Sequence, residues 1–394
     1  MPEEQTKSIS EKLQHLPLAA VINSLAAWAT ANKFPFVVYR LPHQSHFNFM
    51  AGTEITKVSD DDLSSIGSGF LFSSYDDEKK FINQGLSFSS SDRKIKTSAS
   101  WPSHVSLDLL GQVNDTWQPY YSNNHDAQTS YEEYLVQVRN CINEIKNSNL
   151  IKVVPSLIKR VKLPKGLNLS NTFLKLCDRY ANAFVSILST PEQGTWVTAS
   201  PETLIEVNSE GIFRTMSLAG TQAYTNEQPL HTLPWTQKEI EEQAMVSRYI
   251  INRFKEIRLR EFEEVGPRTV KAGNLAHLCS TFTVDTKATD YDDLGSIMLK
   301  LLHPTSAVCG MPKPLAKALL KSIEKHQRKL YSGYLGPVNM QEGSYIYVNL
   351  RCMEVLKDEA ILYAGAGVTA YSVAEDEWQE TELKCNTLLN IIQG

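Results

Sequence analysis

The chain has 394 residues, of which 42% are hydrophobic and 21% are charged, so it can bury the core of a large globular protein. The formal net charge of −5 and the scattered Lys and Arg residues argue against a nucleic-acid partner. The acidic start and the lack of a long apolar stretch are not typical of secreted or membrane proteins, so we expect a cytoplasmic protein with no membrane partner.

The first 130 residues predict mixed helix and strand and contain no motif that indicates a function. Apolar residues recur at helical spacing at Leu18, Val21, Ile22, Leu25 and Ala29. A strand is predicted at residues 36–39. The segment 59–129 is rich in Ser, Asp, Asn and Gly, so we expect long surface loops there, with short aromatic strands such as residues 70–72.

Helix and strand signals are clearer in residues 131–394. Ser130 and Glu133 predict a capping box ahead of an amphipathic helix, which leads to a strand at residues 151–154. Further strands are predicted at residues 184–188, 196–199, 203–207, 345–350 and 360–363, and helices near 172–180, 237–260, 313–328 and 375–392. No Pro- or Gly-rich linker follows residue 130, so we expect one continuous domain of mixed α/β (α+β) class.

Two predicted helices carry acidic residues three apart near their starts. The predicted N-cap and acidic residues are Thr236, Glu239 and Glu242 in the first helix and Ser372, Glu377 and Glu380 in the second. If the two helix faces met, four carboxylates would converge and would need a cation. Oxygen ligands without Cys or His favour Mg²⁺. For either helix alone, the better explanation is that its acidic residues complement the helix dipole, and Glu239 can be a capping-box residue.

Three further residues have alternative interpretations. Lys152 lies in a short apolar run, so it either reaches solvent from an edge strand or faces a cavity, where desolvation would suit a general base. Glu202 follows an apolar strand and is either a solvated turn residue or a buried carboxyl with a raised pKa. His277, taken alone, is typical of a core histidine.

Several short motifs follow one another in a fixed order. They are Lys152-Val153-Val154, Ser200-Pro201-Glu202, Leu218-Ala219-Gly220-Thr221, residues 303–310 (HPTSAVCG), Tyr331-Ser332-Gly333, Leu350-Arg351-Cys352, Ala364-Gly365-Ala366-Gly367 and residues 377–381 (EWQET). This ordered set resembles the chorismate-utilising enzymes, which include isochorismate, salicylate, anthranilate and aminodeoxychorismate synthases. The resemblance runs from about Lys152 to Lys384. Residues 131–394 would therefore be the catalytic region, and residues 1–130 the N-terminal part of the same fold.

The resemblance implies a single domain of large packed antiparallel sheets with outer helices and an active site between the sheets. It implies that Glu242 and Glu380 hold Mg²⁺ and that Glu239 and Glu377 support the metal through water. Relatives usually have His where this chain has Gln243. The metal would neutralise the ring carboxylate of chorismate and fix the ring.

The resemblance also implies the catalytic roles. Lys152 matches the lysine that activates water in relatives that hydroxylate chorismate, and Glu202 matches the general acid that protonates the departing C4 hydroxyl. Aminodeoxychorismate synthases have a lysine nucleophile at the position of Ala219, and anthranilate synthases use ammonia and lack the base. The retained lysine and Ala219 favour water as nucleophile, so the resemblance indicates a Mg²⁺-dependent isochorismate synthase, an isomerase.

The remaining matches imply substrate anchors. They are Leu218, Gly220, Thr221, His277, Ala307, Val308, Tyr331, Arg351, Gly365, Gly367 and Lys384. Arg351, which we place inside an apolar strand, suits capture of the enolpyruvyl carboxylate, whereas Lys384 equally fits an i,i+4 pair with Glu380. The alternatives are a salicylate synthase and, in another class, a catalytically silent homologue that binds a partner such as a glutamine amidotransferase. We expect no obligatory amidotransferase, and both menaquinone and siderophore biosynthesis are open.

Overall fold

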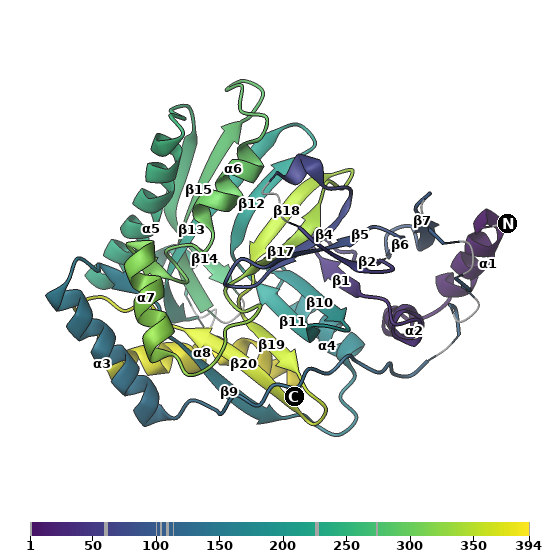
Figure 1. Ribbon diagram of the computed structural model, residues 1–394, viewed down its shortest axis with the longest axis horizontal. Coiled ribbons are helices and arrows are strands. Elements are labelled where there is room, and N and C mark those ends of the chain that lie inside the picture. Colours follow the sequence, from purple (N-terminus) through teal and green to yellow (C-terminus); the bar gives the residue numbers. More distant parts are fainter. Residues whose placement is uncertain are drawn as a thin grey trace.

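Two large antiparallel sheets form the centre of the molecule, and helices cover their outer sides (Figure 1). The computed structural model describes residues 2–58, 62–99, 101–102, 105–107, 110–112, 114–224, 228–272 and 275–393. This arrangement confirms the predicted class of large packed antiparallel sheets with outer helices. Within these residues no helix is long and apolar enough to cross a membrane.

The first sheet has nine strands and is buried on both faces. Its order is β7 (Lys94–Thr97), β6 (Leu86–Ser89), β2 (Asn48–Ala51), β1 (Phe36–Arg40), β10 (Phe184–Thr190), β11 (Gly194–Ser200), β19 (Cys352–Val355), β20 (Glu359–Gly365) and β9 (Ser156–Lys162). Because side chains alternate along a strand, Val185 and Ile187 of β10 join the core beneath the helices. Phe184 and Leu188 join the core between the two sheets. This double burial explains why β10 is a nearly continuous apolar run.

The second sheet also has nine strands. Its order is β14 (Glu263–Ala272), β15 (Leu275–Asp285), β13 (Ile212–Ala223), β12 (Thr203–Asn208), β18 (Gly343–Val348), β17 (Tyr334–Val338), β4 (Gly69–Ser73), β5 (Lys79–Asn83) and β3 (Ile55–Lys57). Phe184 of the first sheet stacks on Tyr347 of the second, with ring centroids 4.4 Å apart. A separate pair of short strands, β8 (Lys152–Val153) and β16 (Gly310–Met311), lies beside the sheets.

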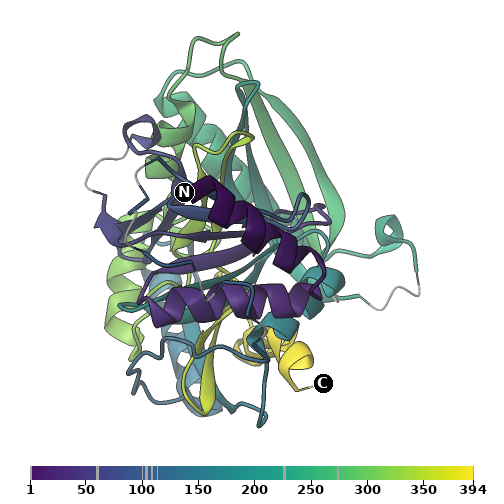
Figure 2. The ribbon, with the colours of Figure 1, turned by 90° about the vertical axis from the view of Figure 1, so that its right-hand side faces the viewer.

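The helices form the outer layers. Those whose buried residues join the core outside the first sheet are α1 (Pro2–Gln14), α2 (Leu18–Ala31), α3 (Tyr131–Asn147), α4 (Leu169–Arg179), α7 (Lys313–Ile323) and α8 (Ala374–Ile392). Helices α5 (Gln237–Glu256) and α6 (Leu294–Leu302) pack outside the second sheet. Short 3₁₀ turns occupy Leu63–Ser65 and Leu230–Thr232. Figure 2 shows α1 and α2 side by side across the N-terminal end of the molecule.

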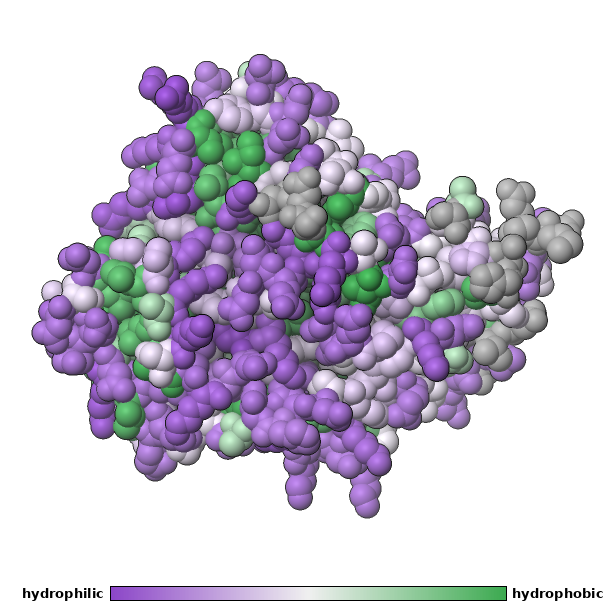
Figure 3. All heavy atoms as spheres, viewed as in Figure 1, coloured by the Kyte–Doolittle hydropathy of each residue, from purple (hydrophilic) through white to green (hydrophobic). Residues whose placement is uncertain are grey.

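The outer surface is mostly polar. Figure 3 shows a largely hydrophilic face on which an apolar patch lies over the region of α7 and α3. Leu315 of α7 and Val136 of α3 are among the exposed large apolar residues. Such scattered apolar groups are normal for a folded surface and indicate no particular partner.

Most predicted elements are confirmed, including α2, β1, α3 to α5 and α8. The capping box at α3 is present, because Ser130 Oγ accepts from the Glu133 backbone N–H and the Glu133 carboxylate accepts from the Ser130 N–H. The strand predicted at residues 151–154 is shorter, since only Lys152 and Val153 pair with β16. The sequence reading missed α6 and the long strands β13 to β15.

Two local predictions are wrong. In the segment 59–129, the predicted aromatic strand at residues 70–72 is confirmed as β4, but the long loops expected next to it are replaced up to Thr97 by β5, β6 and β7, which extend both sheets. Residues 114–129 are indeed without helix or strand. Residues 59–61, 100, 103, 104, 108, 109 and 113 lie outside the described part of the chain. Ser372 is not the N-cap of α8: the cap is Val373, and Ser372 Oγ instead accepts from the Thr369 N–H.

Candidate active site

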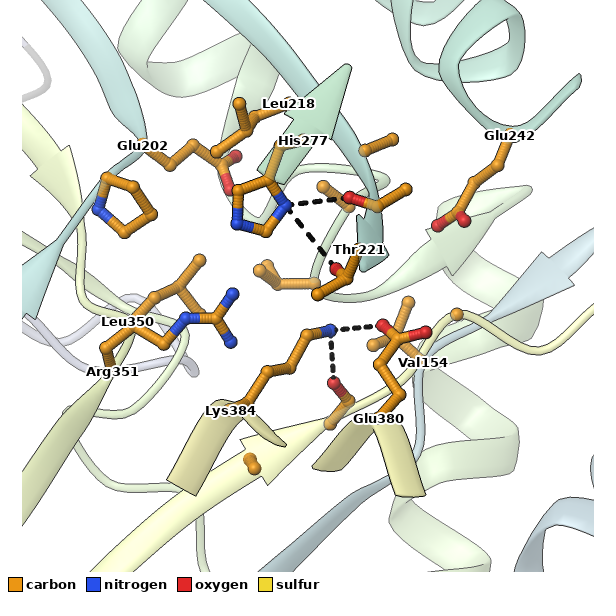
Figure 4. Close-up of a pocket in the computed structure, with 18 of the residues that line it drawn as sticks. Val154, Glu202, Leu218, Thr221, Glu242, His277, Leu350, Arg351, Glu380 and Lys384 are labelled. Atoms are coloured by element: carbon orange, nitrogen blue, oxygen red, sulfur yellow. Dashed lines mark hydrogen bonds and ion pairs between the residues drawn. The ribbon is translucent and has the colours of Figure 1, made fainter. Parts of the chain in front are cut away.

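A cavity of about 60 Å³ lies where the strand ends of both sheets meet α5 and α8. Its walls include every predicted substrate anchor, namely Leu218, Gly220, Thr221, His277, Ala307, Val308, Tyr331, Arg351, Gly365, Gly367 and Lys384. Glu202, Glu242 and Glu380 also line it. Residues separated by up to 230 positions in the sequence, from Val154 to Lys384, are thus brought into one site. Figure 4 shows the polar side chains of Glu202, Arg351 and Lys384 around a common space.

Lys152 is buried beside this cavity. Its side chain is only 1% exposed, so the solvent-facing alternative is wrong. The ammonium Nζ donates to Oε1 of Glu242 at 2.7 Å, which pairs β8 with α5. Gly367 makes this packing possible, because a Cβ there would lie 2.6 Å from the Glu242 carboxylate and 2.8 Å from Lys152 Cε. The lysine therefore sits in a closed environment whose charge partner is a cavity carboxylate.

Glu202 occupies the tight turn between β11 and β12 and is 4% exposed. The solvated-turn alternative is therefore wrong. Burial raises the pKa of the carboxyl to about 7, although the charges of Lys152 and Arg351 oppose the rise. The carboxyl accordingly holds a proton near neutral pH and can donate it to a leaving group.

We expect Glu202→Gln to stabilise the fold at pH 8 but not at pH 4.5. The folded-state pKa of about 7 lies above the ordinary 4.5, so between these pH values folded protein keeps a proton that unfolded chain releases. Stability therefore falls as pH rises through this window, by up to ~3 kcal/mol, since each tenfold change in proton affinity is ~1.4 kcal/mol. Urea unfolding at both pH values measures this. An equal effect of the substitution at both would contradict the assignment.

Arg351, Tyr331 and Tyr363 line the cavity, and Arg351 gives it a positive charge. Contrary to the prediction, Arg351 is not inside a strand but in the turn between β18 and β19, with a φ of 47°. This left-handed turn lets the guanidinium point into the cavity (Figure 4). Tyr331 stacks on Tyr363 with ring centroids 5.5 Å apart, and both line the cavity. Sequence reasoning missed Tyr363, which looked like an ordinary strand residue.

His277 is held in one tautomer by the backbone. Its Nδ1 lies 2.7 Å from the carbonyl oxygen of Gly220. Burial lowers the pKa of the imidazole to about 3, so the ring is neutral and Nδ1 carries the hydrogen. Nε2 is buried without a partner in the described chain and is left as an acceptor. Gly220 has a φ of 66°, which favours glycine at this turn of β13.

Of the four predicted metal carboxylates, Glu242 and Glu380 line the cavity, and three of the four are ion-paired with lysines. Glu242 pairs with Lys152, Glu380 with Lys384 at 2.6 Å, and Glu377 with Lys238 at 2.6 Å. The i,i+4 pair of Lys384 is therefore present, yet Lys384 also lines the cavity and donates to the Gly365 carbonyl.

Glu239 has a separate role. One of its carboxylate oxygens accepts from the Thr236 backbone N–H at 2.7 Å, as a capping-box residue does. Gln243, which stands where relatives usually have His, is buried and donates to Ser217 Oγ at 2.8 Å. Both contacts fix the start of α5, and with it Glu242, against the second sheet.

The carboxylate chemistry fits Mg²⁺. Oε2 of Glu377 is buried without a hydrogen-bond partner, and burial together with the charge of Glu380 raises the pKa of Glu377. For Glu380, burial tends to raise the pKa, but the charge and hydrogen bond of Lys384, together with the charges of Lys238 and Arg351, lower it overall. Among the described residues no three His, Cys, Asp or Glu are already arranged as a metal-binding group. Glu242 and Glu380, whose carboxylates line the cavity, are the residues that would hold a divalent ion.

Comparison with known proteins identifies the family. The chorismate binding enzyme family matches residues 81–393. The chain belongs to the chorismate-binding enzyme family. Enzymes of this family are typically Mg²⁺-dependent, and the family implies chorismate as the substrate.

Proteins that are similar in sequence to this chain include isochorismate synthases. The vibriobactin-specific isochorismate synthase of Vibrio cholerae is 25% identical over 268 residues, which span 67% of each chain. Isochorismate synthase DhbC of Bacillus subtilis is 29% identical over 272 residues, or 66% of this chain and 67% of that protein. The structure of MenF, the menaquinone-specific isochorismate synthase from Escherichia coli, superposes with a TM-score of 0.76 at 20% identity, covering 96% of this chain and 93% of MenF. That last likeness shows the fold.

Proposed function

We propose that this protein is a Mg²⁺-dependent isochorismate synthase that interconverts chorismate and isochorismate. The observation that carries the proposal is the pairing of two buried titratable groups at one cavity, Lys152 and the protonated Glu202. A base and an acid on opposite sides of a ring can add water at C2 while the C4 hydroxyl leaves. The similarity to isochorismate synthases supports the same reaction.

The residues divide the reaction as follows. Lys152, which must first release its ammonium proton, takes a proton from water as the neutral amine while the water oxygen forms a bond to C2, the ring double bond shifts, and the C4–O bond breaks. Glu202 gives its proton to the departing hydroxyl, which leaves as water, so the net change is an isomerisation. The reverse reaction uses the same two groups in exchanged roles. His277 Nε2 accepts a hydrogen bond from a ring hydroxyl.

The anionic groups of chorismate need cations. Arg351 and Tyr331 bind the enolpyruvyl carboxylate, and Lys384 lies close to the ring carboxylate. Bound between Glu242 and Glu380, Mg²⁺ would supply charge neutralisation and orientation of the ring carboxylate. The closed setting excludes bulk water, so the single activated water is the nucleophile that meets C2.

Water is favoured over nitrogen nucleophiles. The position where a lysine nucleophile would stand is Ala219, which is buried and lines the cavity. With Lys152 present as the base, the site needs no amidotransferase partner. Menaquinone and siderophore biosynthesis both remain compatible with this activity.

Incubation with chorismate and Mg²⁺, followed by chromatographic product identification, tests the proposal. We expect isochorismate, approach to the same equilibrium from either side, no anthranilate on addition of ammonium, and little pyruvate. Formation of salicylate and pyruvate in equal amounts at the rate of chorismate loss would assign a salicylate synthase instead. No turnover, combined with a stable complex with a glutamine amidotransferase on gel filtration, would assign a silent partner-binding homologue.

A further inference from the structure

A second cavity, of about 140 Å³, adjoins the active-site cavity. Both cavities are lined by Pro201 and Arg351, so these two residues form the partition between them. We call the second cavity the vestibule and define it by Arg179, Tyr180, Asn182, Pro201, Lys271 and Arg351. It is framed by the end of α4, the end of β14 and α8, and the Asn182 amide joins two of these elements by donating to the Lys271 carbonyl at 3.1 Å.

The vestibule is positively charged. Its described lining includes Arg179, Lys271 and Arg351 and contains no Asp or Glu. Arg179 is exposed, and Lys271 is half-buried with its ammonium 5.7 Å from the centre of the Tyr224 ring. Burial raises the pKa of Tyr180, and the charges of Arg179 and Arg351 oppose that rise, which places both guanidinium groups near this wall. The cavity is thus a basic spot on a chain of net charge −5.

A third arginine, Arg40, offsets a negative feature of the backbone that would otherwise repel an anion. The carbonyl oxygens at the end of α4 carry the negative end of the helix dipole. The guanidinium of Arg40, which is 3% exposed, donates to the carbonyls of Ala181 at 2.6 Å, Tyr180 at 2.7 Å and Cys177 at 3.2 Å. These hydrogen bonds neutralise the helix end directly behind the vestibule.

The opposite side of the active site has no such excess of positive charge. Glu242 and Glu380 lie across the cavity from Arg351 (Figure 4). These two carboxylates are paired with Lys152 and Lys384, and Glu377 is paired with Lys238, so the charges on this side balance. A dicarboxylate approaching between α5 and α8 would therefore meet no net attraction, whereas the described lining of the vestibule offers cations and no Asp or Glu.

We propose that the vestibule is the route by which the anionic substrate reaches and leaves Arg351, with Arg179 and Lys271 as steering residues. This inference rests on the proposed function, because it takes the ligand to be the dicarboxylate chorismate. Charged clefts with low-dielectric walls concentrate ions of opposite sign and raise association rates ~10–10³-fold, an effect that salt weakens.

The test measures the association rate of chorismate with the full chain in the presence of Mg²⁺ by stopped-flow tryptophan fluorescence. Steady-state kinetics of the same variants gives kcat and kcat/KM. We expect Lys271→Glu and Arg179→Glu each to lower the association rate and kcat/KM ~10-fold at low ionic strength, with kcat changed less than ~2-fold. In about 0.5 M NaCl the loss should shrink below ~3-fold. Arg179→Lys, which keeps the positive charge, should associate with chorismate at a rate close to that of the wild type. The matched control is Lys175→Glu, because Lys175 is exposed on the same helix α4 but does not line the vestibule.

The outcomes separate the two proposals. The vestibule route would be overturned if Lys271→Glu and Arg179→Glu associated with chorismate as fast as Lys175→Glu does. Conversion of chorismate to isochorismate by the wild type would still support the proposed function in that case. A loss that persisted in high salt, or that appeared in kcat alone, would also overturn it, because steering acts on association. Chorismate that binds with the expected salt dependence but is not converted would overturn the proposed function and leave the route standing.

Discussion

Lys152→Ala and Glu202→Gln are each expected to lower kcat ~10²–10⁴-fold, because each removes a positioned proton-transfer group from the reaction. Lys152 is hydrogen-bonded to Glu242 at 2.7 Å, and the raised pKa of Glu202 keeps its carboxyl protonated near neutral pH. Steady-state kinetics with chorismate and Mg²⁺ measures the loss. Circular dichroism in the near ultraviolet checks that the aromatic core is intact.

A matched control separates chemistry from loss of an ion pair. Lys159 of β9 forms an ion pair with Glu382 at a distance of 2.6 Å, and neither residue lines the cavity. Lys159→Ala therefore removes a similar contact without affecting the proposed mechanism. It should retain wild-type kcat. Added methylamine should partly restore Lys152→Ala if the amine acts as a base. A kcat near the wild-type value in Lys152→Ala would require another base.

Local patterns in the sequence predicted several of the helices and strands around the site. The capping boxes at Ser130 and Thr236 and the apolar run of β10 are short-range signals, because a cap depends on residues three apart and a strand on alternation. The ordered motifs then predicted which residues line the cavity, and the structure does bring those residues together. Their assigned roles remain predictions.

What the sequence could not predict depends on long-range contacts. The pairing of Lys152 with Glu242 joins residues 90 positions apart, and no local pattern distinguishes it from a lysine on an exposed edge. The strands of residues 69–97 are rich in Ser, Lys and Asn, yet they extend sheets whose other strands come from distant parts of the chain. Tertiary pairing overrides weak local propensity there.

Arg351 illustrates the same limit at a single residue. Its neighbours Leu350 and Cys352 suggest a continuous strand, but the left-handed φ of 47° ends one strand and turns the guanidinium into the cavity. A non-glycine residue in this conformation is uncommon and strained. The surrounding sheet order, rather than any local preference, keeps the residue in that conformation.

Removal of Mg²⁺, or of either carboxylate proposed to hold it, is expected to abolish turnover. Glu242→Ala and Glu380→Ala leave Lys152 and Lys384 without their ion-pair partners and leave the substrate ring carboxylate without its bridging cation. Both variants should also lose Mg²⁺ binding in calorimetry, a readout that does not depend on turnover. Excess EDTA should stop the wild-type reaction, and added Mg²⁺ should restart it.

The control for the metal prediction lies on the same helix. Glu382 of α8 pairs with Lys159 and does not line the cavity, so Glu382→Ala should keep both Mg²⁺ affinity and turnover. Full activity of the wild type in excess EDTA would contradict the metal assignment. The ion pairs would then be the working state of the site, because Lys152, Lys238 and Lys384 already neutralise Glu242, Glu377 and Glu380 one for one. Loss of turnover on chelation would instead mean that the three lysine charges do not replace the divalent ion, which Glu242 and Glu380 would hold and which would neutralise and orient the substrate ring carboxylate.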